Sequence, residues 1–381
     1  MAPQSPKAWG SLVPAPGESI AWAALLALIP DLEPLKVTPQ DPIHHAEGDV
    51  WTHTMMVCEA LLKLHAYREA DPDLRFVLFY ACLLHDLAKP SCTQILDTGR
   101  ITSAGHSKRG AIDARVVMWR AGIPFALREQ ICRIIAQHQL PFYAIQGSKG
   151  RTAEFLANSL SWDCTIDALC VVAEADLRGR HCADSVLILD NIELFREMAR
   201  EQGCYHQPRE FPDAHTRLSY FRSEGSISPD YAFFQEPGSA VTVLSGLPAS
   251  GKNTWVSREM PNLAVISFDD AREELGLKHG VSAGAAVHLA IDRAKALLRA
   301  KKPFVWNATH LSDLMLSKTL DLLYRYNAQV EIVYLESPEA VIKARNAARD
   351  TTLSNPAIDK MLCRWEVPLP SLAHVVRYEV T

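Results

Sequence analysis

The first half of the chain carries the apolar spacing of amphipathic helices. Between residues 19 and 210, apolar side chains recur at intervals of three and four residues, which places them on one face of a helix. Residues 74–88 and 126–138 each carry such a stripe, and Phe76 and Leu83 belong to the first. The pattern predicts an all-α first domain.

Two short stretches stand out within this half. At residues 93–102, two apolar runs flank Asp97-Thr98-Gly99, a composition typical of a β-turn between two small strands. We expect a surface hairpin there. The apolar stretch at residues 20–29, which Pro30 closes, is too short to cross a bilayer, and we interpret it as a core helix.

A segment between Arg222 and Gly238 is rich in Ser, Gly, Pro and acidic residues, as linkers are. The spacing of apolar residues changes after it. Beyond it come short runs of branched apolar residues, each followed by a helical stretch. This βαβ alternation predicts an α/β domain with a mainly parallel sheet. The runs are residues 241–244, 263–267, 304–306 and 330–335.

The length supports a multidomain chain. Its 381 residues exceed what one hydrophobic core commonly serves. We expect an N-terminal tail at 1–18, the helical domain at 19–222, a linker at 223–239 and the α/β domain at 240–381.

Charge and cysteine content narrow the class of protein. The formal net charge of −5 gives no bulk attraction to a polyanion, which disfavours a protein that coats long nucleic acid. An enzyme that binds a few phosphates locally is still compatible with this net charge. The nine cysteines form no CxxC pair, which fits a reducing compartment. We expect a cytoplasmic protein without a membrane segment.

A glycine-containing motif, Gly246-Leu-Pro-Ala-Ser-Gly-Lys252, lies between the predicted strand at residues 241–244 and a predicted helix. A phosphate-binding loop requires this context, because its glycines let backbone N–H groups turn onto phosphate oxygens at a helix N-terminus. A simple turn is the alternative for the loop alone, but strand, spacing and lysine together favour ATP or another NTP. The expected nucleotide-binding residues here are Gly246, Ser250, Gly251, Lys252, Asn253 and Thr254.

The position after the lysine departs from the usual motif. A Ser or Thr hydroxyl that ligates Mg²⁺ is normal there, whereas this chain has Asn253 followed by Thr254. The Asn carbonyl offers an oxygen in its place, so the departure concerns the metal contact and leaves phosphate binding intact.

Asp269 and Arg272 follow the second strand, at the end of the sheet where open α/β folds bind ligands. Three residues apart, they share one face of the next helix. A carboxylate there can take the proton of an attacking hydroxyl, and the arginine can hold an acceptor phosphate. We also expect Asp270 and Glu273 to form a capping box at the start of this helix.

Arg345 and Arg349 lie one turn apart on a helix expected to begin at Ser337 and Pro338. Such a pair is commonly a solvated surface. Behind a phosphate-binding loop, however, it favours a lid whose guanidinium groups close on the nucleotide.

The helical domain contains a series of histidines and aspartates in metal-ligand order. Imidazole with carboxylate suits a borderline transition ion, and a bound ion acidifies water and polarises a phosphoryl oxygen. The chemistry expected is phosphoester hydrolysis with one or two divalent ions. The candidate ligands are His53, His85, Asp86, His106, His138 and Asp176.

The second-domain motifs together resemble the 5′-hydroxyl polynucleotide kinase branch of P-loop kinases. The resemblance implies that Asp269 is the general base and that Arg272 holds a phosphate of the acceptor strand. It also implies that Arg345 and Arg349 clamp the donor phosphates. Asn307, after the third strand, stands where that family often has an aspartate, and we assign it to the substrate side.

The first domain resembles the HD domain of bacterial CCA-adding tRNA nucleotidyltransferases, across roughly residues 30–180. The stretches that carry this resemblance are His45-Ala-Glu-Gly-Asp-Val-Trp-Thr-His53-Thr, His85-Asp-Leu-Ala-Lys89-Pro, Gly105-His106 and Ala-Asp176-Leu-Arg-Gly-Arg180.

The order of the two domains resembles the bifunctional HD-Pnk family of end-healing enzymes. The resemblance implies a kinase joined to a 2′,3′-phosphodiesterase that acts on RNA or DNA ends. A ligase encoded elsewhere is a possible partner. His53, His85, Asp86 and Asp176 would hold one metal. His106 and His138 would serve a second metal or the phosphate, and Lys89 would contact the scissile phosphate.

Two alternatives stay open on the sequence. One is a nucleoside or sugar kinase fused to a nucleotide phosphohydrolase, since both folds host many substrates. The other is a regulatory protein in which one domain only senses a ligand.

Overall fold

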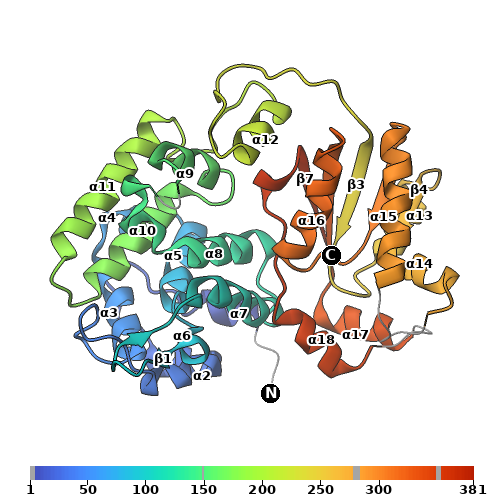
Figure 1. Cartoon of the computed structure of the whole chain (residues 1–381). Coiled ribbons are helices and arrows are strands. Elements are labelled where there is room, and N and C mark those ends of the chain that lie inside the picture. The colour runs from blue at the N-terminus through green and yellow to red at the C-terminus, as the bar shows by residue number, and fades with distance from the viewer. Residues whose placement is uncertain (1–4, 148–149, 278–283, 349–352) are drawn as a thin grey trace. The chain divides into compact units, whose positions relative to one another are not determined.

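The computed structural model describes residues 5–147, 150–277, 284–348 and 353–381. The chain forms two compact units, Met1–Glu210 and Phe211–Thr381, coloured blue through green and yellow through red in Figure 1. Each unit has a hydrophobic core of its own. Within the described ranges, no helix combines the length and apolarity needed to cross a membrane.

The first unit is built around the buried helix α5 (Pro72–Leu84). Asp71 caps this helix by accepting a hydrogen bond from Leu74 N, which satisfies one of the free N-terminal amides. Pro72 is the first residue of the helix and has no amide hydrogen to satisfy. Every residue from Phe76 to Leu84 is buried. Helices α3, α8 and α10 pack against α5, so four helices meet around one core.

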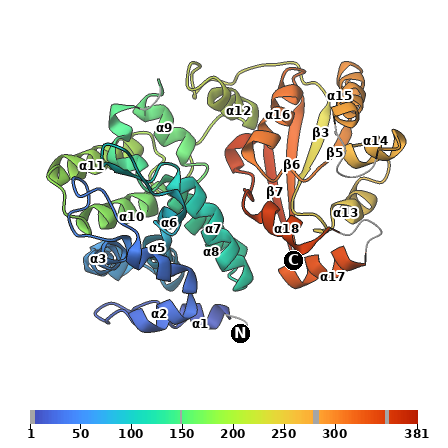
Figure 2. The same ribbon diagram turned by 60° about the horizontal axis from the view of Figure 1, so that its bottom comes forward.

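The elements of this unit are α1 (Pro6–Gly10), α2 (Trp22–Leu28), η1 (Pro30–Val37), α3 (Val50–Lys63), α4 (His65–Glu69), α5, α6 (Lys89–Cys92), β1 (Gln94–Ile95), β2 (Ile101–Thr102), α7 (His106–Arg120), α8 (Phe125–Gln137), η2 (Leu140–Phe142), η3 (Ala144–Gln146), α9 (Ala153–Leu160), α10 (Ile166–Arg178) and α11 (Ser185–Glu201). Strands β1 and β2 form the expected antiparallel hairpin. Helices α7 and α8 lie side by side (Figure 2).

The N-terminal residues differ from the expected tail. Trp9 on α1 is fully buried and belongs to the core of the first unit. Tyr80 donates a hydrogen bond to the carbonyl oxygen of Trp9, and Tyr67 donates one to that of Pro14, both at 2.7 Å. Because burying an indole ring is strongly favourable, this segment is part of the first unit.

The second unit contains a five-stranded sheet in the order β4-β5-β3-β6-β7, parallel throughout. Alternate strand residues face opposite layers. Val243 and Trp306 pack in one cluster with α15 and α16, whereas Leu244 and Val305 pack in another with α13. The sequence anticipated four of these strands. The edge strand β7 contains only exposed and half-buried residues and lacks a continuous apolar run.

The elements of the second unit are α12 (Ala214–Arg222), β3 (Ala240–Ser245), α13 (Lys252–Glu259), β4 (Ala264–Ser267), α14 (Phe268–Glu274), α15 (Gly284–Arg299), β5 (Phe304–Asn307), α16 (Asp313–Tyr324), β6 (Gln329–Glu336), α17 (Glu339–Ala347), α18 (Asn355–Leu362), η4 (Pro370–Leu372) and β7 (Val375–Val380).

Helix α12 belongs to the second unit, although composition suggested a boundary after Arg222. The buried guanidinium of Arg217 donates hydrogen bonds to the carbonyl oxygens of Ala373 and His374, each at 2.8 Å. The expected linker is also tied to this helix, because Phe233 N donates to Thr216 Oγ1 at 2.9 Å. The division between the units therefore falls near Glu210.

Candidate active sites

The first unit brings the six candidate ligands into one buried cluster. Helix α3 carries the first histidine, the turn after α5 carries the adjacent His-Asp pair, α7 begins with the third histidine, the fourth follows α8, and α10 carries the last aspartate. All six are buried. The cluster comprises His53, His85, Asp86, His106, His138 and Asp176.

The Nε2 and carboxylate atoms of this cluster lie at the spacing of ligands around a small ion. His53 Nε2 is 3.1 Å from Asp176 Oδ1 and 3.2 Å from His85 Nε2. Asp86 faces two ways, with Oδ2 3.1 Å from His85 Nε2 and Oδ1 3.3 Å from His106 Nε2. Ligands bound at 2.0–2.2 Å lie roughly 3 to 3.5 Å apart.

Backbone carbonyl groups determine which nitrogen each histidine turns inward. The Nδ1 atoms of His85, His106 and His138 each lie 2.7–2.8 Å from the carbonyl oxygen three residues earlier in the chain. The Nδ1 of His53 lies 3.2 Å from the carbonyl oxygen of Gly179. A carbonyl oxygen only accepts, so Nδ1 carries the proton and Nε2 presents its lone pair.

Electrostatics keep the carboxylates charged and lower the pKa of two histidines, His106 and His138. Burial alone would raise the pKa of Asp86, but His85 and Lys89 hold it well below its usual range. Burial would likewise raise the pKa of Asp176, and Arg180 together with His53 holds it down. Burial lowers the pKa of His138 to about 3. Metal binding requires ionised carboxylates and neutral imidazoles. Burial would lower the pKa of His85, but Asp86 and Asp176 raise it, so a bound ion competes with a proton for this ring.

Two cations border the cluster. Lys89 Nζ lies 2.7 Å from Asp86 Oδ2 and donates to Gln40 Oε1 at 2.6 Å. Arg180 Nη2 donates to Asp176 Oδ1 at 2.5 Å. Lys89 was expected here from the sequence. Arg180 was not, although it lies only four residues after Asp176, just beyond the end of α10.

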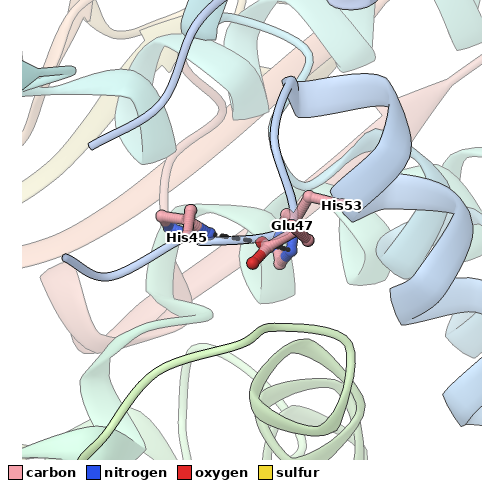
Figure 3. Close-up of side chains that lie close together, drawn as sticks. All are labelled: His45, Glu47 and His53. Atoms are coloured by element: carbon pink, nitrogen blue, oxygen red, sulfur yellow. Dashed lines mark hydrogen bonds and ion pairs between the residues drawn. The ribbon is translucent and has the colours of Figure 1, made fainter. Parts of the chain in front are cut away.

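A further carboxylate, absent from the expected set, borders the cluster. Glu47 lies between His45 and His53 and contacts the Nδ1 atoms of both (Figure 3). Its only signal in the sequence is its place in the stretch that begins at His45 and ends at His53.

The residues fit a divalent transition ion. Imidazole and carboxylate together form the ligand set that such ions prefer. Asp176 Oδ2 is buried and has no hydrogen-bond partner among the described residues, which is unfavourable for a carboxylate unless a cation compensates it. Asp86 presents one oxygen to each of two histidines, so the cluster offers ligands for one or two ions.

In the second unit, the glycine motif forms a loop between β3 and α13. Gly246 has a φ of 141°, and a Cβ at this position would lie 2.2 Å from the carbonyl oxygen of Leu335, so only glycine fits. Lys252 begins α13, and its Nζ donates to the carbonyl oxygens of Gly246 and Leu247. The buried Ser250 Oγ has no hydrogen-bond partner among the described residues. The loop is therefore shaped to take an anion.

The two asparagines of this site meet. Asn307, the last residue of β5, donates from Nδ2 to Asn253 Oδ1 at 2.8 Å. Strands β3 and β5 are neighbours, so the end of β5 lies beside the start of α13. Thr254 is exposed on α13. An amide pair thus occupies the place where the usual motif has a hydroxyl.

The segment that follows β5 supports the phosphate-binding loop, a role that the sequence did not predict. Gly246 N donates to the carbonyl oxygen of Thr309 at 2.9 Å, and Ser245 Oγ donates to that of His310 at 3.2 Å. The buried imidazole of His310 contacts the carbonyl oxygen of Leu244 through Nδ1. Burial lowers the pKa of His310 to about 4, so this histidine supports the loop as a neutral group.

Asp269 and Arg272 share one face of α14, as their spacing predicted. Arg272 Nη1 lies 2.8 Å from Asp269 Oδ1, and the Asp269 side chain is 79% exposed. The expected capping box is wrong: Ser267 is the N-cap, and its Oγ accepts from the amides of Asp269 and Asp270. Ser267 stands immediately before the helix, where an N-cap side chain reaches the first free amides, so Asp270 is not needed as a cap.

Arg345 lies against the phosphate-binding loop. It is carried by α17, whose N-cap is Pro338, and its Nη1 donates to Ser337 Oγ at 3.1 Å. A Cβ on Gly251 would be 3.4 Å from the same nitrogen. Arg349, the other expected lid residue, lies outside the described residues.

Comparison with known proteins agrees with this division of the chain. An AAA-domain family model matches residues 241–368. The Multifunctional CCA protein of Halorhodospira halophila is 33% identical over 131 residues, 34% of this chain and 29% of the relative. The protein of that name from Methylococcus capsulatus is 31% identical over 160 residues, 41% of this chain and 35% of the relative. The chain thus spans about a third of the length of these relatives.

A solved structure from Chloroflexus aurantiacus aligns with a TM-score of 0.33 and 17% identity, covering 39% of this chain and 87% of that one. The chain combines a helical unit with a P-loop kinase-like α/β unit and is similar to CCA proteins.

Proposed function

We propose that this chain heals nucleic-acid ends, most readily those of RNA, with one chemistry in each unit. The second unit phosphorylates a 5′-hydroxyl with ATP and Mg²⁺. The first unit hydrolyses a 2′,3′-cyclic phosphate, as a phosphodiesterase. One observation carries the proposal: the same chain holds a buried ring of imidazole and carboxylate ligands and, separately, a P-loop followed by the Asp269–Arg272 pair.

In the kinase unit, Lys252 and Arg345 bind the donor phosphates, and Arg349 is assigned to the same clamp. Asp269 accepts the proton of the 5′-hydroxyl as its oxygen attacks the γ-phosphorus and ADP leaves. Arg272 holds a phosphate of the acceptor strand. Its hydrogen bond to Asp269 also orients the carboxylate of the base.

In the HD unit, His53, His85, Asp86 and Asp176 hold a divalent transition ion, and His106 with His138 serve a second ion or the phosphate. A bound ion supplies an acidified water and polarises the phosphoryl oxygen. Lys89 contacts the scissile phosphate through the same Nζ that now lies against Asp86. The fixed Nδ1 protons of the histidines keep their Nε2 atoms directed at the ion.

Two further observations support the setting of this function. All nine cysteines are free thiols, which fits the reducing cytoplasm. The relatives are named CCA proteins, which favours a nucleic-acid end as substrate. A ligase encoded elsewhere would use the 5′-phosphate that the kinase produces.

The test is incubation of the purified protein with ATP and an RNA that bears a 5′-hydroxyl and a 2′,3′-cyclic phosphate. Both ends are followed separately, and a nucleoside and a matching DNA are assayed in parallel. We expect label from the γ-phosphate on the RNA 5′ end and opening of the cyclic phosphate. Phosphorylation of the nucleoside alone would identify a small-molecule kinase instead.

A further inference from the structure

Glu47 lies in the segment that leads into α3, immediately outside the ligand cluster. Its side chain is 1% exposed, and its Oε1 is 2.8 Å from His45 Nδ1 and 2.9 Å from His53 Nδ1. Figure 3 shows the carboxylate between the two rings. Its other oxygen, Oε2, accepts a hydrogen bond from His181 N at 2.9 Å. Both carboxylate oxygens are therefore engaged.

His53 differs from the other three histidines of the cluster in its outer partner. The Nδ1 atoms of His85, His106 and His138 face backbone carbonyl oxygens. That of His53 faces the carboxylate of Glu47 in addition to the carbonyl of Gly179. A carboxylate is the stronger acceptor, and a carboxylate behind a ligating histidine fixes the tautomer and raises the basicity of Nε2.

We propose that Glu47 is a positioning residue of the metal centre, which fixes His53 with its Nε2 directed at the ion. This inference rests on the proposed role of the cluster as a metal centre. Glu47 acts on a second ligand as well. The His181 amide that it holds follows Arg180, whose guanidinium contacts Asp176, so one carboxylate braces ligands from α3 and α10.

Hydrogen bonding explains the contacts of Glu47 better than a separate ion at His45 and Glu47 does. The separations of 2.8 and 2.9 Å match N–H···O hydrogen bonds and are shorter than the spacing of ligand atoms around an ion. Burial would raise the pKa of Glu47, but hydrogen bonds from His45, His53 and the His181 amide lower it strongly. Glu47 is thus an anion that accepts from both rings.

The test is the affinity of the full-length protein for Co²⁺, measured by competition with a chelator and by the visible absorption of the bound ion. We expect Glu47→Ala to weaken Co²⁺ binding about 10–100-fold. Glu47→Gln keeps one acceptor oxygen and should lose less. In the metal-free protein, ¹⁵N spectra should show His53 protonated at Nδ1 in the wild type and a mixture of tautomers in Glu47→Ala.

Asp49→Ala is the matched control. Asp49 caps α3 through Thr52 N. This variant removes a carboxylate of the same segment whose contacts are with Thr52, and it keeps the backbone carbonyl that accepts from His53 N. Its Co²⁺ affinity should equal that of the wild type. If folded Glu47→Ala and Glu47→Gln both bind Co²⁺ with the wild-type affinity, the positioning role is overturned. Loss of one whole ion in both His45→Ala and Glu47→Ala would overturn it in favour of a metal site at those residues. A wild-type protein that binds no Co²⁺ would instead refute the metal centre itself.

Discussion

Single residues in this chain act through the direction of individual atoms. Asp86 offers Oδ2 to His85 and Lys89 and Oδ1 to His106. One carboxylate therefore contacts two histidines of the cluster, each through a different oxygen. In the second unit, Asp269 is exposed and held by Arg272. A base that must meet an incoming hydroxyl needs this exposure, because its partner arrives from solvent.

The general-base assignment predicts the effect of Asp269→Ala. Loss of the carboxylate should lower 5′ phosphorylation about 10²–10⁴-fold and leave hydrolysis by the first unit intact. Asp270→Ala is the control, since that exposed neighbour has no assigned role. Kinase assays on both variants decide the matter. A full rate in Asp269→Ala would end the assignment.

The amide pair predicts that Asn253→Ser keeps most kinase activity. The shorter side chain still offers an oxygen to Mg²⁺, and Asn307 Nδ2 loses only one acceptor. The measurement is the dependence of the kinase rate on Mg²⁺ concentration, with the wild type alongside. Complete loss of activity at saturating Mg²⁺ would show that Asn253 has a different role.

The sequence identified the six residues that the first unit brings together, because a His-Asp pair with flanking ligands is a local and ordered signal. It did not identify Glu47 or Arg180 as parts of the site. The contact of Glu47 with the His181 amide joins the segment before α3 to the end of α10, and residues this far apart in sequence leave no periodic trace. Arg180 lies only four residues after Asp176, a local spacing that the prediction overlooked. The capping error at Asp270 had a local cause, since Ser267 competes for the same amides.

At the scale of elements, a buried ion network joins α7 to α8. Glu129 accepts from Arg115 Nε and Nη2 at 2.9–3.0 Å and from Arg128 Nε at 2.8 Å. All three side chains are buried. These helices carry His106 at the start of one and His138 after the end of the other, so the network fixes two candidate ligands relative to each other.

Glu129→Gln should therefore destabilise the first unit by about 3–5 kcal/mol, because it removes the buried carboxylate charge that both guanidinium groups contact. Hydrogen exchange of peptides from α7 and α8 under increasing urea measures this. Glu193→Gln is a control, since Glu193 is half exposed in its pair with Arg196 and its loss should cost less than about 1 kcal/mol. Equal stability of Glu129→Gln and wild type would refute the network's role.

The same network predicts a loss of stability in acid. Burial would raise the pKa of Glu129, but Arg115 and Arg128 hold it below the ordinary value of 4.5. A group whose pKa is depressed by folding stabilises the fold above its unfolded value and loses that contribution as the pH falls. Protection of α7 and α8 should thus decrease below about pH 4.5, and less steeply in Glu129→Gln. Parallel pH profiles would contradict this.

Elements with continuous apolar runs or regular stripes were predictable, and those without them were not. Strands β3 to β6 follow from their branched residues, whereas the half-exposed β7 does not. Helix α12 was placed in the wrong unit because its assignment depends on Arg217 reaching Ala373. Burial of Trp9 likewise depends on tertiary packing rather than on the proline-rich composition around it.

At the scale of the whole chain, each unit contains its own core and its own candidate site. The ligand cluster lies wholly in residues of the first unit, and the phosphate-binding loop with its partners lies wholly in the second. Sites that share no residues and no core are expected to fail independently. This independence is the central claim of the account.

The most direct measurement uses Asp86→Ala and Lys252→Ala side by side, each checked for folding by circular dichroism. Both are incubated with ATP and an RNA that carries a 5′-hydroxyl and a 2′,3′-cyclic phosphate. We predict that Asp86→Ala loses bound transition metal and cyclic-phosphate opening but still phosphorylates the 5′ end, and that Lys252→Ala does the reverse. If either folded variant is inactive at both ends, the two-site account is contradicted.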